Sequence, residues 1–126
     1  MNTAIVTGGS KGFGLSLVQA LVGRGWAVIA DARHGSRLDT AIRGLNGPGR
    51  VVAVPGDITD AEHRARLIEV GRGIGGFDLL VHNASALGPS PLPPLAEFPL
   101  AALEQVYAVN VVAPLALTQL ALPLLA

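Results

Sequence analysis

The residues whose types and spacing best suit chemistry form a glycine-rich run from Thr7 to Gly14. Apolar residues 4–6 precede the run, and apolar residues at helical spacing follow it. Gly8 would let the chain turn sharply off a strand, and Gly12 would leave room for a pyrophosphate. Gly14 would let the following helix pack closely. The helix N-terminus would then face the phosphates. The run therefore predicts a dinucleotide site, and a glycine turn without a ligand stays open as the alternative.

Polar residues also follow the other segments that we expect to be strands. These are residues 26–30, 51–54 and 77–81, which are short, apolar and bounded by turn residues. The residues that come after them are, in chain order, Asp31, Ala32, Arg33, Asp57 and Asn83. Because the carboxyl ends of parallel strands meet at one edge of a sheet, we expect these residues and the glycine run to converge there.

The segments between the strands have the features of helices. Leu38, Ala41, Ile42 and Leu45 have amphipathic spacing, and Ser36-x-x-Asp39 and Thr59-x-x-Glu62 resemble capping boxes. Strands separated by helices predict an α/β fold with a parallel sheet. We expect a Rossmann-type doubly wound sheet that is incomplete, with about four strands in the order 3-2-1-4.

Residues 86–99 carry five prolines and predict an extended loop. Helical spacing then returns at Leu100 and Leu103, and we expect a helix that continues to the end of the chain with a kink near Pro114. The apolar tail 111–126 is expected to be too short and too interrupted to span a membrane.

Composition limits the classes of partner. The chain has 126 residues, 50% hydrophobic and 14% charged, with a formal net charge of +0 and scattered basic residues. Nucleic acid and anionic membranes are therefore not expected as partners. Cysteine is absent, which excludes disulfides and thiolate metal sites and favours a reducing compartment. The N-terminus has no basic region typical of a signal peptide. We expect a cytoplasmic protein without a metal site.

Four motifs in order resemble those of the short-chain dehydrogenase/reductase family. The spacing Thr-Gly-x-x-x-Gly-x-Gly is similar to the family's cofactor fingerprint, and Asp57-Ile58-Thr59 looks like the element that binds adenine. His82-Asn83-Ala84-Ser85 looks like a variant of the Asn-Asn-Ala-Gly motif, and Val109-Asn110-Val111 looks like the segment with the Asn of the catalytic tetrad. The resemblance runs from residue 4 to residue 125.

The resemblance implies roles for particular residues. It implies that Asn110 is catalytic. The residues implied to bind the cofactor are Thr7, Gly8, Ser10, Lys11, Gly12, Phe13, Gly14, Arg33, Asp57, Ile58, Asn83, Ala84 and Ser85. Structural alternatives stay open: Asp57 could only cap a helix, and Asn110, on the apolar side of its helix, could only be a satisfied buried amide. His82 is interpreted as a satisfied histidine near a strand end.

Two cations favour NADP(H) as the cofactor. A 2′-phosphate needs positive charge, whereas a ribose 2′-hydroxyl is usually held by a carboxylate. Lys11 and Arg33 stand where the family's NADP-preferring members carry basic residues, and Ala32 stands where NAD-preferring members tend to carry Asp. Asp31 lies one residue earlier, and a register shift of one residue would reverse the prediction. NAD(H) therefore stays possible.

The family's Tyr-x-x-x-Lys motif is absent from these residues. Lys11 is the only lysine, Tyr107 is the only tyrosine, and the residue four positions after Tyr107 is Val111. We therefore expect residues 1–126 to be the N-terminal portion of an NAD(P)-binding Rossmann domain, without the catalytic C-terminal portion and inactive alone.

The resemblance implies hydride transfer between a nicotinamide and a carbonyl or alcohol substrate, in a protein that forms a homo-oligomer at full length. The alternative is a non-catalytic dinucleotide-binding module that acts as a sensor or scaffold. A methyltransferase is a third reading, against which the glycine spacing and Asn83-Ala84 argue.

Overall fold

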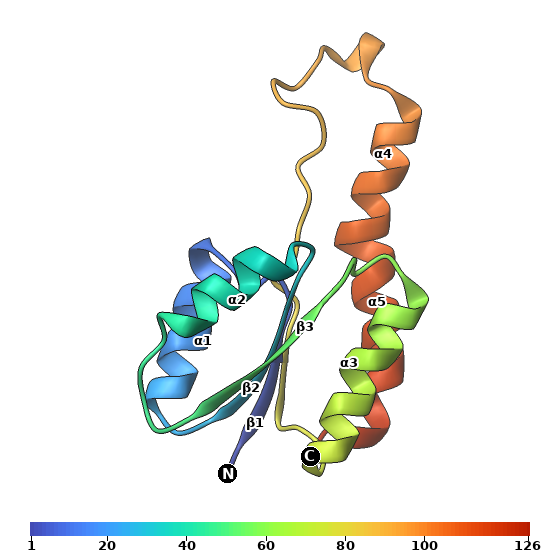
Figure 1. The fold of residues 1–126 in the computed structure, drawn as a ribbon. Helices are drawn as coiled ribbons and strands as arrows, with labels where there is room; N and C mark the ends of the chain where they lie inside the picture. The colour runs from blue at the N-terminus through green and yellow to red at the C-terminus, as the bar shows by residue number, and fades with distance from the viewer.

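The computed structural model describes all 126 residues and shows a parallel sheet with helices on both faces (Figure 1). Its strands are β1 Thr3–Val6, β2 Ala27–Ala32, β3 Arg50–Pro55 and β4 Leu79–Val81. Its α-helices are α1 Gly12–Gly23, α2 Gly35–Arg43, α3 Ala61–Ile74, α4 Leu100–Tyr107 and α5 Ala113–Ala121. Three short helical segments complete the chain, η1 Leu95–Glu97, η2 Ala108–Val112 and η3 Leu122–Leu124.

The sheet has four strands in the order β3-β2-β1-β4, and every pairing is parallel. The predicted α/β fold class and strand order are therefore confirmed. Helices α1 and α2 cover one face, and α3 and α5 cover the other (Figure 1). Because parallel strands need crossover connections, the helices on both faces bury the central strands completely.

Alternation along the central strands divides the core between the two faces. Ile5 and Ile29 point to one face, where they join Leu67 of α3 and Leu117 of α5. Their neighbours along β1 and β2 point to the other face and pack against α1 and α2. That second cluster contains Ala4, Val6, Val28, Ala30, Val18, Leu21, Val22 and Leu38. The position of each helix is thus determined by the strand residues that it covers.

Both predicted capping boxes are wrong in detail. Helix α2 begins at Gly35 after His34, and no side chain caps it. Helix α3 begins one residue later than predicted, because Asp60 is its N-cap and accepts a hydrogen bond from the Glu62 N–H at 3.0 Å. Thr59 lies before the cap, and both its N–H and its hydroxyl donate to Asp57.

Two strand boundaries also differ from the prediction. Strand β2 extends through Asp31 and Ala32, which were expected to follow it, because both pair with β3 and are buried. Strand β4 is shorter than residues 77–81 and begins at Leu79. Phe77 instead forms an isolated bridge with Leu125 and packs in the core between α3 and α5.

The proline-rich loop leads away from the sheet, and the chain returns along one long helical rod (Figure 1). The expected kink near Pro114 is a π-helical turn, residues Ala108–Val112, immediately before α5. Proline has no N–H to donate to the carbonyl four residues earlier, and the wider π-helical turn accommodates this missing hydrogen bond.

The helical rod is longer than the tail considered from sequence. It runs from Leu100 to Leu124, 25 residues, with a mean hydropathy of 1.5 in its most apolar window and 11% of that window buried. By length and composition alone, the rod could cross a bilayer. The same length and composition also occur in interface helices of water-soluble proteins. The length argument from residues 111–126 was therefore wrong, because α4 continues into α5.

Candidate functional site

A cleft of about 650 Å³ opens at the carboxyl ends of the strands. It is lined by the glycine turn after β1, the end of β2, the segments after β3 and β4, and two residues of the helical rod. The prediction that the residues after the four strands converge at one edge of the sheet is therefore confirmed. A cleft in this place is where open α/β sheets bind ligands.

Most of the predicted cofactor-binding residues meet in this cleft. Those that line it are Gly8, Ser10, Lys11, Gly12, Arg33, Asp57, Ile58, Asn83, Ala84 and Ser85. Four predicted site residues do not line it. They are Thr7, Phe13, Gly14 and Asn110. Phe13 is 72% exposed and outside the lining, whereas Thr7 and Gly14 are buried beneath it.

Three glycines give the turn its shape. Gly8 and Gly12 have φ values of +67° and +57°, a region that favours glycine. A Cβ on Gly14 would overlap the carbonyl oxygen of Gly8 and the side-chain amide of Asn83. Gly14 was expected to bring α1 close to the sheet, and the structure shows that the close neighbours are the turn and Asn83.

Thr7 braces the turn from below. Its hydroxyl accepts hydrogen bonds from the N–H groups of Asn83 and Ala84, both at 3.0 Å, and donates to the carbonyl of Val81 at 3.4 Å. The side-chain amide of Asn83 donates to the carbonyl of Gly8 at 2.9 Å. The loops after β1 and β4 are thereby joined into one rigid floor of the cleft.

Sequence reasoning did not assign Asp31 the role that the structure gives it. Its carboxylate is buried, and Oδ1 accepts the Gly8 N–H at 2.7 Å. Its Oδ2 lies 2.7 Å from Nε2 of His63, a residue that the sequence did not single out. An acidic residue within an otherwise apolar strand was the available signal, since a buried carboxylate needs partners.

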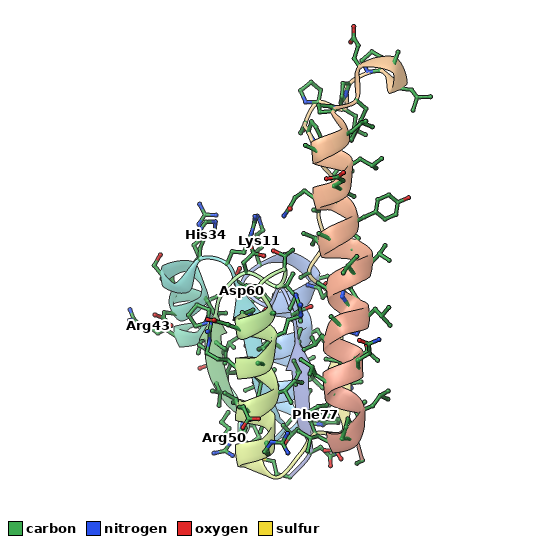
Figure 2. The ribbon with its side chains drawn as sticks, turned by 90° about the vertical axis from the view of Figure 1, so that its right-hand side faces the viewer. Lys11, His34, Arg43, Arg50, Asp60 and Phe77 are labelled. Atoms are coloured by element: carbon green, nitrogen blue, oxygen red, sulfur yellow. The ribbon has the colours of Figure 1, made fainter.

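The cleft edge beside β2 carries most of the positive charge. Lys11, Arg33, His34 and Arg37 line it, and Figure 2 shows Lys11 and His34 pointing outward at the same end of the sheet. Helices α1 and α2 both begin at this edge without a side-chain cap or an acidic residue in the first turn. Their N-terminal dipoles therefore add to the attraction for an anion.

Asp57 provides an acidic group to the cleft, in the segment after β3. The N–H of Thr59, at 2.9 Å, and its hydroxyl, at 2.8 Å, both donate to Oδ1 and hold the pKa of Asp57 below its ordinary value. Arg33 lowers this pKa further by its charge. Asp57 is not the N-cap of α3, so it is available to the cleft as a carboxylate.

Asn110 lies in the π-helical turn and outside the cleft lining. Its side chain accepts from the N–H of Ala86 and donates to the carbonyl of Ala86, each at 2.8 Å. The expectation that it would be buried on an apolar face was wrong, because that side of the helix is exposed. In this structure its amide ties the helical rod to the loop after β4.

His82 lies at the end of β4, where its Nε2 is 2.8 Å from the hydroxyl of Thr118. Partial burial lowers the pKa of His82 below its ordinary value. The interpretation of His82 as a satisfied histidine agrees with this geometry. No group of three or more metal-ligating side chains is present.

Comparison with known proteins places these features in a family. The model of the short chain dehydrogenase family matches residues 2–126. The protein belongs to the short-chain dehydrogenase family. It is 37% identical over 109 residues to 1-deoxy-11-beta-hydroxypentalenate dehydrogenase from Streptomyces arenae, which covers 85% of this chain and 38% of that protein. It is 36% identical over 124 residues to the rhamnolipids biosynthesis 3-oxoacyl-[acyl-carrier-protein] reductase from Pseudomonas aeruginosa, covering 97% and 47%.

Solved structures agree with this assignment. L-sorbose reductase from Gluconobacter frateurii, complexed with NADPH and L-sorbose, superposes with a TM-score of 0.87 at 28% identity, covering 97% of this chain and 46% of that one. The Pseudomonas aeruginosa RhlG/NADP active-site complex gives a TM-score of 0.85 at 30% identity, covering 98% and 47%. The chain thus spans less than half the length of these relatives.

Proposed function

We propose that this protein binds a nicotinamide dinucleotide in the cleft at the carboxyl ends of its strands, with NADP(H) preferred over NAD(H). The observation that carries the proposal is the charge distribution at the end of β2. Arg33 and Lys11 are exposed in the cleft, whereas both oxygens of Asp31, the carboxylate at the end of β2, are already engaged. A 2′-phosphate could bind these cations, whereas Asp31 is not available to accept a hydrogen bond from a ribose 2′-hydroxyl.

The residues present fit such a cofactor. The uncapped N-terminus of α1 and the open backbone at Gly12, where a Cβ would meet nothing within 4 Å, would accept the pyrophosphate. Asp57 and Ile58 would hold the adenine, and Asn83, Ala84 and Ser85 would shape the part of the cleft below the nicotinamide. Thr7 and Gly14 would act by positioning the glycine turn, and Ser10 and Phe13 would complete it.

The proposed activity of the full-length protein is that of an oxidoreductase. When bound, the nicotinamide supplies or takes up a hydride, exchanged with the carbonyl or alcohol carbon of a small-molecule substrate. Asn110 is the proposed catalytic residue within this chain, on the resemblance of Val109-Asn110-Val111 to the family's segment with the tetrad Asn. Its hydrogen bonds with Ala86 would hold the loop after β4 against the helical rod. Residues 1–126 contain no Tyr-x-x-x-Lys, and we propose that they do not turn over substrate alone.

We further propose that the protein works in the cytoplasm as a homo-oligomer and does not bind nucleic acid or membranes. The absence of cysteine fits a reducing compartment, and the net charge of +0 offers no attraction to a polyanion. The exposed apolar side of the helical rod is the surface that a second subunit would cover. A non-catalytic dinucleotide-binding module is the second candidate, favoured by the absence of Tyr-x-x-x-Lys within these residues.

Cofactor binding to the wild type and to Arg33→Ala tests the proposal. The substitution is expected to weaken NADP⁺ binding by about 1–3 kcal/mol, the scale of a charge-assisted hydrogen bond, and to leave NAD⁺ binding nearly unchanged. Arg24→Ala is the matched control, because Arg24 is exposed at the other end of α1 and outside the cleft. Equal losses for both cofactors on Arg33→Ala, measured by isothermal titration calorimetry, would refute the preference.

A further inference from the structure

A buried pair of side chains lies directly beneath the cofactor cleft. Nε2 of His63, on α3, is 2.7 Å from Oδ2 of Asp31, on β2, and the two side chains are 0% and 3% exposed. The other carboxylate oxygen accepts the Gly8 N–H at 2.7 Å, and the main-chain carbonyl of Asp31 accepts the Gly9 N–H at 2.8 Å. Asp31 therefore connects the glycine turn to α3.

The imidazole of His63 has little freedom to do anything else. Its ring lies so close to Gly56 that a Cβ there would overlap Nδ1, the ring carbon Cγ and Cε1. Nδ1 has no hydrogen-bond partner. The tautomer with its proton on Nε2 satisfies the pair, because Nε2–H then donates to Asp31 and no buried donor is left over. The single polar contact of His63 is thus the one that holds the carboxylate.

Asp31 has access to the cleft, and His63 has none. Asp31 is among the residues that line the cleft, next to Ala32 and Arg33, while His63 is fully enclosed. A buried carboxylate oxygen that loses its donor is costly, and the nearest place to regain hydrogen bonds is the cleft. There, a carboxylate would accept a ribose 2′-hydroxyl and repel a 2′-phosphate.

We propose that His63 is a positioning residue that determines cofactor specificity. By holding Oδ2 of Asp31, it keeps the carboxylate on the Gly8 amide and away from the ribose 2′ position, which is left to Arg33 and Lys11. The inference rests on the proposed dinucleotide function and adds a determinant that does not touch the cofactor. His63 of α3 would thus act together with Lys11 and Arg33 in favouring NADP(H).

Two nucleotides that differ chiefly at the 2′ position test the inference with the full-length protein. Adenosine 2′,5′-bisphosphate and adenosine 5′-monophosphate probe the adenosine half of the cleft without requiring catalysis. His63→Leu is expected to lower the affinity ratio of the bisphosphate over the monophosphate by roughly tenfold, the factor that corresponds to a charge-assisted hydrogen bond. A purely structural loss would weaken both nucleotides by the same factor and leave the ratio unchanged.

Conservative and compensating variants sharpen the test. His63→Gln retains an N–H that reaches Asp31 and is expected to keep the wild-type ratio, whereas His63→Asn is too short and should behave like His63→Leu if the latter does not fold. Asp31→Asn combined with His63→Leu removes the released charge and should restore the ratio. An unchanged ratio in both His63→Leu and His63→Asn overturns the inference. Failure of the wild type to bind either nucleotide overturns the proposed function instead.

Discussion

Strands β2 and β4 flank β1 on opposite sides and differ sharply in burial. All six residues of β2 are buried, and the strand is paired on both edges. The three residues of β4 are only half-buried, and β4 is paired with β1 alone. A free strand edge offers unpaired N–H and C=O groups to another chain. We call the β2 side, which carries most of the proposed cofactor site, the finished half, and the β4 side, with its free edge, the uncovered half.

The helices repeat this contrast. Helix α1 buries Gly14, Val18, Leu21 and Val22. Helix α4 buries none of its residues, and Leu115, Leu120 and Leu122 farther along the rod are 60%, 44% and 61% exposed. We propose that these exposed leucines belong to an interaction surface.

The largest effect on stability is expected from a substitution at Gly14, in the finished half. Gly14→Val would drive a side chain into the Gly8 carbonyl and the Asn83 side-chain amide, which are held together by the hydrogen bond from that amide to that carbonyl. We expect a loss of about 3 kcal/mol in the free energy of unfolding, at the upper end of overpacking costs, together with loss of dinucleotide binding. Urea denaturation and calorimetric titration measure the two quantities.

Gly73→Ala is the matched control for this substitution. Gly73 lies within α3, and a Cβ there would meet nothing within 4 Å. The change should raise stability by up to about 1 kcal/mol through helix propensity. A Gly14→Val protein as stable as the wild type would show that the turn can move and that the close approach is not essential.

The second effect concerns the uncovered half. We predict that the isolated chain associates, because each leucine left exposed forgoes about 1.5–3 kcal/mol of burial. Replacing Leu115 and Leu122 with Glu should shift the chain from oligomers towards monomer in light scattering coupled to gel filtration. Arg43→Glu, an exposed charge reversal on α2, is the control and should leave the oligomeric state unchanged. A monodisperse wild-type monomer at micromolar concentration would contradict the predicted role of this surface.

A smaller effect is expected at His82, on the uncovered side. Partial burial lowers the pKa of His82 from its ordinary value of 6.5, so the unfolded chain takes up a proton more readily than the folded chain. Stability should therefore fall as the pH drops from about 6.5 through the lower folded pKa. His82→Gln can still hydrogen-bond with Thr118 but does not titrate, and its urea midpoint should vary less over this range. If the urea midpoints of both proteins changed equally with pH, His82 would not be the group responsible for the pH dependence.

The smallest effect is expected at Asp57, on the finished side. Hydrogen bonds from Thr59 lower the pKa of Asp57 below 3.8, so its contribution to stability is fully present above that pH. It is lost as the pH falls through the folded pKa. The stabilities of the wild type and Asp57→Asn should differ slightly at neutral pH and converge in acid, because the carboxylate is exposed and screened by solvent. A difference that persists at low pH would mean that the amide itself disturbs the turn with Thr59.

Local patterns in the sequence carried the correct strand order and most of the cleft. The glycine run, Asp57 and Asn83 each follow a buried apolar segment, and parallel topology brings the ends of such segments together. Boundaries were less predictable, as the one-residue shift at the start of α3 shows. There, Asp57 accepts the N–H of Thr59 and Asp60 accepts the N–H of Glu62, and only the folded geometry determines which of these residues caps the helix.

The sequence by itself determined that this chain forms a parallel α/β sheet with a glycine turn, because strand hydrophobicity and glycine spacing act over a few residues. Only the tertiary structure decided what Asp31 does. Its role depends on Gly8 and His63, which lie 23 and 32 residues away in the chain and reach it through hydrogen bonds across two elements. It also decided that Asn110 pairs with the backbone of Ala86 and does not lie in the core, because the rod turns other residues, such as Ala113 and Leu117, towards the sheet. Local pattern determines which elements form, and the packing of distant elements determines which side chains meet.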